Sequence, residues 1–198
     1  SNVLTGQLFD VPVLGTHAHS WIMSFPDEYT AFKTYADLYP NACTLLVDTY
    51  DTLKSGVPNA IRVFKEMRKA KRLNGRYGIR LDSGDLAYLS KEARKMLDAA
   101  GFHDAVISAS SDLDEYLIDS LKTQGAKITS WGVGTNLITS RDCPAFGGVY
   151  KLAAIKEGDK EFIPKIKLSE NTEKITNPGN KTVYRIYEKA NGKLKADL

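Results

Sequence analysis

Polar residues that could bind an anion or handle a phosphate follow several short apolar stretches of the chain. Residues 15–21 read GTHAHSW, residues 48–52 read DTYDT, residues 82–85 read DSGD and residues 108–112 read SASSD. An imidazole can act as a nucleophile or as an acid/base group near neutral pH. Carboxylates can hold magnesium or stabilise positive charge that develops on a sugar. These segments are therefore the candidate site, although Asp85 could simply cap the helix expected after it.

Two glycine-rich segments could add a phosphate-binding function. Residues 132–136 read GVGTN and residues 147–148 are both glycine, so backbone amides could approach a phosphate closely there. The spacing matches neither the dinucleotide-binding fingerprint nor the P-loop, because no Gly-Lys-Ser/Thr follows. Tight turns remain the plain alternative.

Arg80 is the unusual residue of an apolar stretch, because it stands between Ile79 and Leu81, directly before the DSGD segment. A guanidinium is always charged, so a strand that enters a core should carry it only where an anion or a carboxylate meets it. The simpler alternative is an ion pair with Asp82 at the end of the strand.

His17 and His19 form a His-x-His pair of the kind that binds zinc in barrel hydrolases. Such a site needs further histidines from later strands, and the remaining histidine, His103, follows Gly101 at the far end of a helix. This argues against a zinc hydrolase. One histidine could instead act as a nucleophile or acid/base group, or both could be hydrogen-bonded in a loop.

The composition is that of an ordinary globular protein, with 198 residues, 42% hydrophobic and 26% charged residues, and a net charge of +3. This charge argues against a general nucleic-acid binder, and no segment reaches the apolar length needed to cross a membrane. Cys43 and Cys143, without a signal peptide, suggest a reducing cytoplasm and no disulfide framework. Both ends look cut, and Ser1 and Asn2 could be a cloning scar.

The chemistry-bearing segments are spaced like the units of an α/β fold. Apolar runs at residues 11–14, 43–47, 77–81, 105–107, 127–131 and 149–155 predict strands, with helical patterns between them. The units recur at roughly 25 to 35 residues, as in a β/α barrel or a doubly wound sheet, whose sites lie at the carboxyl ends of the strands. Residues 1–155 are thus expected to form a partial barrel. Residues 156–198, where 165–168 and 182–187 alternate, are expected to form an antiparallel β appendage within a second domain.

Taken in order, five motifs resemble those of the nicotinate phosphoribosyltransferase family. They are GTxAHxW at 15–21, DTYD at 48–51, GxRLDSGD at 78–85, GVGT at 132–135 and GGVYKL at 147–152, and the resemblance covers nearly the whole chain. It implies an irregular β/α barrel of the type II phosphoribosyltransferase kind, an open-faced β domain, and a homodimer with composite sites. The implied reaction, in NAD biosynthesis, condenses nicotinate with phosphoribosyl pyrophosphate to nicotinate mononucleotide and pyrophosphate. The resemblance also implies that ATP hydrolysis is coupled to this reaction through a phosphohistidine.

The resemblance also implies residue roles. His19 is the expected phosphohistidine, Thr16 and Arg80 the contacts of the nicotinate carboxylate, and Asp82 the residue facing the ribose and its Mg²⁺. His19, Arg80 and Asp82 would be catalytic. Gly132, Gly134 and Thr135 would hold the 5-phosphate. Further substrate contacts are expected at Asp48, Ser83, Ser110, Arg141, Gly147 and Gly148.

Two departures from the family pattern shape the functional expectation. The family is more than twice as long, and its amino-terminal part, which supplies an aromatic residue that stacks on nicotinate, has no counterpart here; Ser111 stands where asparagine is expected. We therefore expect the chain alone to be inactive and to self-associate. A nicotinamide-using relative, or a catalytically silent phosphate-binding or assembly domain, are the alternatives.

Overall fold

The structure is a computed structural model that describes residues 2–139, 149–168 and 175–198. Four parallel strands form its main sheet and lie side by side in sequence order: β1 (Ala42–Leu46), β2 (Arg76–Leu81), β3 (Val106–Ala109) and β4 (Ser130–Trp131). Leu45 lies opposite Ile79, which lies opposite Ile107, and all three are fully buried. The expected parallel sheet is thus confirmed, whereas closure into a barrel stays a prediction.

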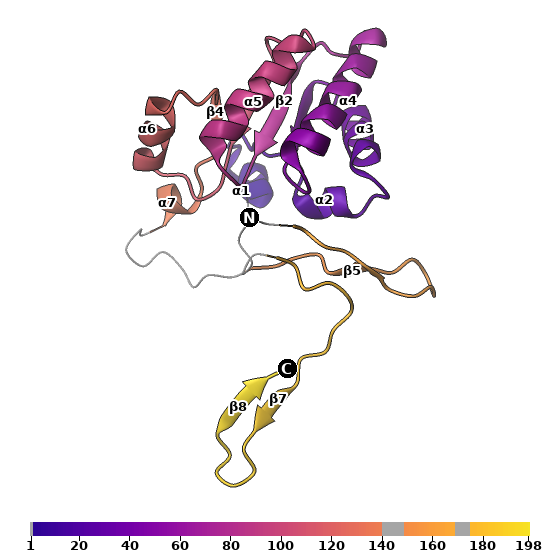
Figure 1. Cartoon of the computed structure of the whole chain (residues 1–198), viewed down its shortest axis with the longest axis vertical. Helices are drawn as coiled ribbons and strands as arrows, with labels where there is room; N and C mark the ends of the chain where they lie inside the picture. Colours follow the sequence, from indigo (N-terminus) through magenta and orange to yellow (C-terminus); the bar gives the residue numbers. More distant parts are fainter. Residues whose placement is uncertain (1, 140–148, 169–174) are drawn as a thin grey trace.

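Helices connect these strands and cover the sheet. α3 (Glu28–Leu38) packs on α4 (Val57–Lys69), which packs on α5 (Leu86–Ala99), and α4 and α5 lie over the same face of the sheet (Figure 1). α6 (Glu115–Thr123) follows β3. The core between helices and sheet includes the fully buried rings of Phe32, Phe64 and Phe102.

Aspartate side chains fix where three of these helices begin. Each carboxylate accepts a hydrogen bond from a backbone amide of the first turn: Asp27 from Thr30 at 2.8 Å, Asp85 from Tyr88 at 2.9 Å, and Asp114 from Leu117 at 2.7 Å. Capping satisfies amides that have no partner within the helix. The capping role considered for Asp85 is therefore confirmed.

A π-helical turn, η1 (Thr52–Gly56), leads into α4 and was not expected from the sequence. Asp51 caps it by accepting hydrogen bonds from the amides of Leu53 and Lys54 at 3.1 and 2.8 Å. Gly56 lies against the end of β1, where an added Cβ would be 1.8 Å from the carbonyl oxygen of Val47. Glycine is therefore required for this close approach.

The strand expected at residues 11–14 is wrong. After α1 (Asn2–Phe9), residues 10–18 form neither helix nor strand, and α2 (His19–Met23) follows. Val11, Val13 and Leu14 are exposed, and in the described part of the chain no strand pairs with this segment. An apolar run becomes a strand only where a neighbour can take its hydrogen bonds.

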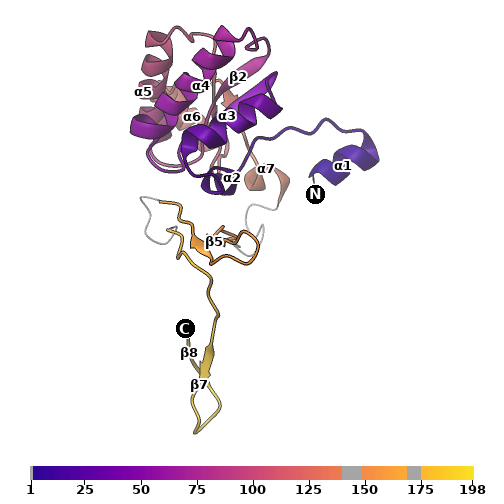
Figure 2. The same ribbon diagram turned by 90° about the vertical axis from the view of Figure 1, so that its right-hand side faces the viewer.

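The carboxyl-terminal part contains two small antiparallel pairs, as expected for the appendage. β5 (Ala154–Ile155) pairs with β6 (Ile163–Pro164), and β7 (Arg185–Tyr187) pairs with β8 (Leu194–Asp197). The β7–β8 hairpin projects away from the main sheet, and α1 also stands clear of it (Figures 1 and 2). The strand expected over 149–155 is reduced to β5, which pairs with β6 and does not join the parallel sheet, and residues 165–168, which were expected to form a strand, are neither helix nor strand. The division of the chain at residue 155 stays a prediction. Of the helices described, none has the length and apolar character that a membrane span requires.

Candidate functional site

The carboxyl ends of the parallel strands bring four of the expected site residues into contact. Asp48, which follows β1, accepts hydrogen bonds through Oδ2 from the backbone N–H of Asp82 at 2.8 Å and from the hydroxyl of Ser83 at 2.7 Å. Ser110, which follows β3, donates a hydrogen bond to Asp82 Oδ1. The tips of three neighbouring strands are thus linked, because parallel strands place their carboxyl ends at one edge of the sheet.

His19 joins this group from the first turn of α2. Its Nδ1 lies 3.0 Å from the hydroxyl of Thr49, and its Nε2 lies 3.6 Å from Asp82 Oδ2 and 3.9 Å from Asp48 Oδ1. His19 Nε2 and Asp48 Oδ1 are both buried without a hydrogen-bond partner. Thr49 therefore holds one nitrogen of the ring, while the other faces two carboxylates.

The pKa of Asp82 reflects this setting. Burial alone would raise the pKa, but the contacts with His19 and Ser110 and the positive charge of Arg80 outweigh it, so the pKa lies below its usual value. Asp82 is accordingly ionised at neutral pH. An ionised carboxylate at this position can act on positive charge or on a divalent cation.

Arg80 points toward the segment before α2 and donates a hydrogen bond from Nη1 to the hydroxyl of Thr16. It binds Thr16 rather than forming the ion pair with Asp82 that the sequence left open. Arg80 Nε is buried and has no hydrogen-bond partner. A guanidinium with a free donor beside a hydroxyl suits a planar carboxylate.

His17 is a buried structural histidine, which separates it from His19. Its Nε2 accepts a hydrogen bond from the backbone N–H of Leu46 at 3.3 Å, and its ring meets that of Tyr35 edge-on at 4.5 Å. Burial, with the charge of Arg80, lowers the pKa of His17 to about 4. Of the alternatives weighed for the two histidines, hydrogen bonding inside a folded loop describes His17.

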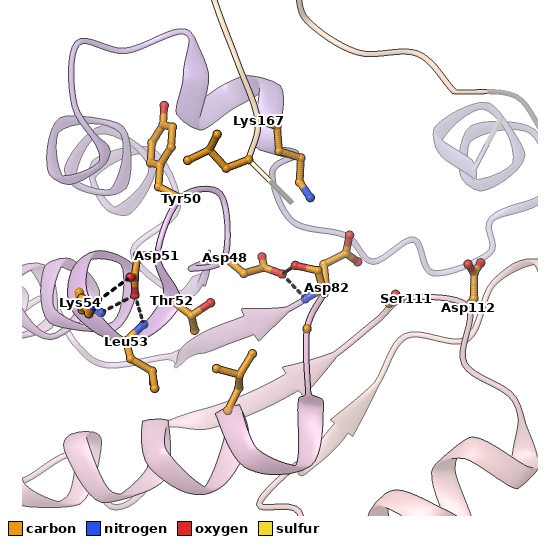
Figure 3. A pocket seen from close by; sticks show the side chains of 14 residues that line it. Asp48, Tyr50, Asp51, Thr52, Leu53, Lys54, Asp82, Ser111, Asp112 and Lys167 are labelled. Carbon is orange, nitrogen blue, oxygen red and sulfur yellow. Dashed lines mark hydrogen bonds and ion pairs between the residues drawn. The ribbon is translucent and has the colours of Figure 1, made fainter. Parts of the chain in front are cut away.

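A cavity of about 1030 Å³ opens beside the linked tips. The carboxylates of Asp48 and Asp82 and the ammonium group of Lys167 face the same space (Figure 3). The cavity is lined by Asp48, Tyr50, Asp51, Thr52, Leu53, Lys54, Asp82, Ser83, Gly84, Leu89, Ser111, Asp112, Lys167 and Leu168. The mixture of carboxylates and lysines suits a phosphate that arrives with a divalent cation.

Three cavity residues were missed in the sequence, namely Leu53, Lys54 and Lys167. Lys167 comes from the appendage, where the buried residue Thr176 holds its backbone. The N–H of Lys167 donates to Oγ1 of Thr176 at 3.2 Å, and the N–H of Thr176 donates to the carbonyl oxygen of Lys167 at 3.4 Å. The alternating pattern of residues 165–168 placed this lysine on a half-exposed strand, but no local signal indicates which distant loop its side chain faces.

The glycine-rich tip of β4 lies next to the tip of β3. Gly132 donates its N–H to the carbonyl of Ala109 at 2.8 Å, and Gly134 and Thr135 begin the short helix α7 (Thr135–Ile138). Gly132, Gly134 and Thr135 are exposed. Arg141, Gly147 and Gly148, the other expected contacts, lie outside the described residues.

The residues present fit a magnesium ion that is held mainly by substrate. In the described ranges no group of three or more His, Cys, Asp and Glu side chains is arranged to hold a metal. Asp48 Oδ1 is nevertheless a buried oxygen without a hydrogen-bond partner. It lies near the same nitrogen, His19 Nε2, as Asp82 Oδ2 does. Mg²⁺ commonly binds one or two carboxylates together with substrate phosphates. The geometry therefore suits a cation that arrives with a phosphorylated ligand.

Comparison with known proteins gives these residues their context. No protein-family model matches the chain. Nicotinate phosphoribosyltransferase of Bacillus subtilis is 59% identical over 197 residues, which are 100% of this chain and 39% of that protein. The chain thus spans about two fifths of this curated relative.

Solved structures show the same likeness. The nicotinate phosphoribosyltransferase from Porphyromonas gingivalis superimposes with a TM-score of 0.64 at 26% identity, covering 89% of this chain and 47% of that one. The human nicotinic acid phosphoribosyltransferase gives a TM-score of 0.57 at 27% identity, covering 95% and 43%. The resemblance predicted from the motifs is confirmed: over its whole length this chain is homologous to part of the nicotinate phosphoribosyltransferases.

Proposed function

We propose that this chain carries the phosphoribosyl site of a nicotinate phosphoribosyltransferase, the enzyme expected to condense nicotinate with phosphoribosyl pyrophosphate. The observation that carries the proposal is the contact between His19, Asp48, Asp82 and Ser110 at one edge of the sheet, in a chain 59% identical to the Bacillus subtilis enzyme. The parallel sheet would form part of an irregular β/α barrel, since its strands follow one another in sequence order.

Asp82 would stabilise positive charge on the ribose as pyrophosphate leaves. Its pKa lies below the usual value, so the carboxylate is ionised when the oxocarbenium-like charge develops. When bound, Mg²⁺ would neutralise the pyrophosphate oxygens. Asp48 Oδ1 and Asp82 Oδ2 are the oxygens available to it.

Nicotinate would be held by Arg80 and Thr16. Arg80 already donates to the Thr16 hydroxyl and keeps a buried donor, Nε, without a partner. A carboxylate can accept from the guanidinium through both of its oxygens, which a carboxamide does less well because its nitrogen is not an acceptor. This favours nicotinate over nicotinamide, and a comparison of the two affinities decides between them.

His19 would accept the γ-phosphoryl group of ATP on a ring nitrogen, and ADP would leave. Its Nδ1 contacts Thr49, while its Nε2 is free of hydrogen bonds and faces Asp48 and Asp82. A phosphorylated imidazole would add about two negative charges beside these carboxylates and so change how tightly the site holds Mg²⁺ and pyrophosphate. Binding of phosphoribosyl pyrophosphate without phosphorylation of His19 by ATP would favour a silent binding domain instead.

The whole enzyme is proposed to be a cytoplasmic homodimer with composite sites, and the 198-residue chain alone is expected to show no turnover.

Binding of phosphoribosyl pyrophosphate with Mg²⁺ to this chain, measured by calorimetry, tests the phosphoribosyl site. Asp82→Asn should weaken binding about tenfold, because it removes the charge that meets the cation. Asp119→Asn removes the same charge from an exposed position on α6 and should leave binding unchanged. Equal affinity of the Asp82→Asn and wild-type chains would contradict the proposal.

A further inference from the structure

The loop after β3 has a backbone conformation that its side chains do not favour. Ser111 has a φ of 101° and Asp112 a φ of 46°, and neither residue is glycine. Aspartate visits the left-handed region with some frequency, but serine at this φ is uncommon. Both residues line the cavity beside Asp82 (Figure 3). Something outside the loop must therefore hold this conformation at the site.

Asn136, the second residue of α7, supplies that support. Its Nδ2 donates hydrogen bonds to the carbonyl oxygens of Asp112 at 3.0 Å and Leu113 at 3.1 Å. These are the two donor hydrogens that a carboxamide possesses. Both carbonyls precede the first turn of α6 and have no helical hydrogen bond to make. One side chain thus satisfies two main-chain acceptors of the strained loop.

The loops after β3 and β4 also touch at a second point. Gly132 donates to the carbonyl of Ala109, and an added Cβ at Gly132 would lie 3.4 Å from the Cβ of Ser110. Ser110 in turn donates to Asp82. Contacts on both sides of the strained turn therefore set the spacing between Asp82 and the GVGT segment.

We propose that Asn136 is a positioning residue that locks the Ser111 and Asp112 turn to the glycine-rich tip of β4. It thereby fixes the distance between the carboxylate Asp82 and the loop that receives the 5-phosphate. The inference rests on the proposed function for the identity of the ligand. The lock itself rests on the two hydrogen bonds and the two positive φ angles.

Asn136→Ala is the direct test, and Thr139→Ala is its matched control. Thr139 follows α7 directly, and its hydroxyl donates to the carbonyl of Thr135 at 2.7 Å, so the control removes a side-chain hydrogen bond to the same helix without touching the β3 loop. Asn136→Ala should weaken binding of phosphoribosyl pyrophosphate with Mg²⁺ by about tenfold, and the control by less than twofold.

A second substitution distinguishes positioning from a general loss of structure. Ser111→Gly lets the turn adopt its φ without support, since glycine accepts positive φ freely. If Asn136 acts by holding this turn, Asn136→Ala should lower the affinity for phosphoribosyl pyrophosphate less than about threefold in the Ser111→Gly background. In the wild-type background it should lower this affinity about tenfold. Equal losses in both backgrounds would overturn the proposal.

A ligand-free readout separates this inference from the proposed function. In two-dimensional amide spectra of the free chain, Asn136→Ala should move the signals of residues 110–113, and Thr139→Ala should leave them in place. If Asn136→Ala moves these signals but the wild-type chain binds no phosphoribosyl pyrophosphate, the phosphoribosyl role is refuted and the lock stands. Unmoved signals in Asn136→Ala refute the lock itself.

Discussion

At the scale of single residues, the site owes its character to two aspartates with different surroundings. Asp48 is buried, and its Oδ2 accepts hydrogen bonds from a main-chain and a side-chain donor just after β2, while its Oδ1 has no hydrogen-bond partner. Asp82 is half-buried and carries a lowered pKa. We infer that Asp48 mainly holds the loop after β2 in place, whereas Asp82 faces the ligand.

His17 makes the stability of the protein depend on pH. Its pKa is about 4 in the folded chain and 6.5 in a model peptide, so the unfolded state binds the proton first. The resulting stability is present above pH 6.5 and is lost as pH falls toward 4. Between pH 8 and pH 5 the loss should be about 2 kcal/mol, because at pH 5 the unfolded chain has bound the proton while His17 of the folded chain is still mostly neutral.

Urea unfolding of the wild-type and His17→Gln chains at both pH values measures this effect. Glutamine can accept the Leu46 hydrogen bond but does not titrate, so its free energy of unfolding should fall by about 2 kcal/mol less than that of the wild type over this range. The same slope in both proteins would show that other groups carry the pH dependence.

The sequence could not separate His17 from His19. They are two positions apart in one polar segment, and their roles differ because α2 begins at His19, which directs the two rings to different places. One ring packs against Tyr35, and the other faces Asp48 and Asp82. Arg80 was identifiable because an arginine in an apolar strand needs a partner, although the partner found, Thr16, comes from a distant segment.

At the scale of elements, the site wall depends on how closely η1 approaches β1. Gly56 has ordinary helical φ and ψ angles of −59° and −58°, so glycine is needed there for space and not for its conformation. Gly56→Ala would place a Cβ 1.8 Å from the carbonyl oxygen of Val47, a backbone atom that cannot rotate away. The substitution should destabilise the fold by about 3 kcal/mol or more.

Chemical unfolding of Gly56→Ala beside Gly15→Ala checks this prediction. An added Cβ at Gly15 has no neighbour within 4 Å, so that variant should stay within about 0.5 kcal/mol of the wild type. A wild-type midpoint for Gly56→Ala would mean that η1 does not lie against the end of β1.

The element level also shows what local pattern can and cannot predict. The runs at 43–47 and 77–81 became strands because each lies beside another strand of the sheet, whereas the similar run at 11–14 has no such neighbour and remains irregular. η1 was not predicted because a π-helical turn carries no periodicity of its own, and its only signal was Asp51 before it. One helix start was predictable, since Asp85 was considered as a cap and does cap α5, whereas the caps Asp27 and Asp114 were found only in the structure.

At the scale of the whole molecule, apolar surface is exposed at both ends of the described chain. Phe9 is 71% exposed on α1, and Val183 and Tyr184 are 74% and 64% exposed beside the β7–β8 hairpin. Exposed apolar surface of this kind is typical of sites where a protein associates with another chain. We therefore expect the 198-residue chain to self-associate at micromolar concentration.

Sedimentation velocity over a concentration series measures this association. Replacing Phe9 by serine should lower the associated fraction if the amino-terminal helix takes part, whereas Tyr116→Ser, at an equally exposed position of α6, serves as the control. A compact monomer at all concentrations would contradict the prediction. Sequence motifs alone could suggest the family and its dimer, but which surfaces are exposed depends on tertiary packing.

The hydrogen bond between Asp48 and the main chain of residue 82 has a further consequence. Asp48 accepts this hydrogen bond from the backbone N–H of residue 82 and makes none with its carboxylate. Every amino acid except proline supplies such an N–H. A substitution at position 82 would therefore keep the link to Asp48 but lose the acceptor that Ser110 uses. A redesign of what the pocket accepts at residue 82 must supply a new partner for that hydroxyl.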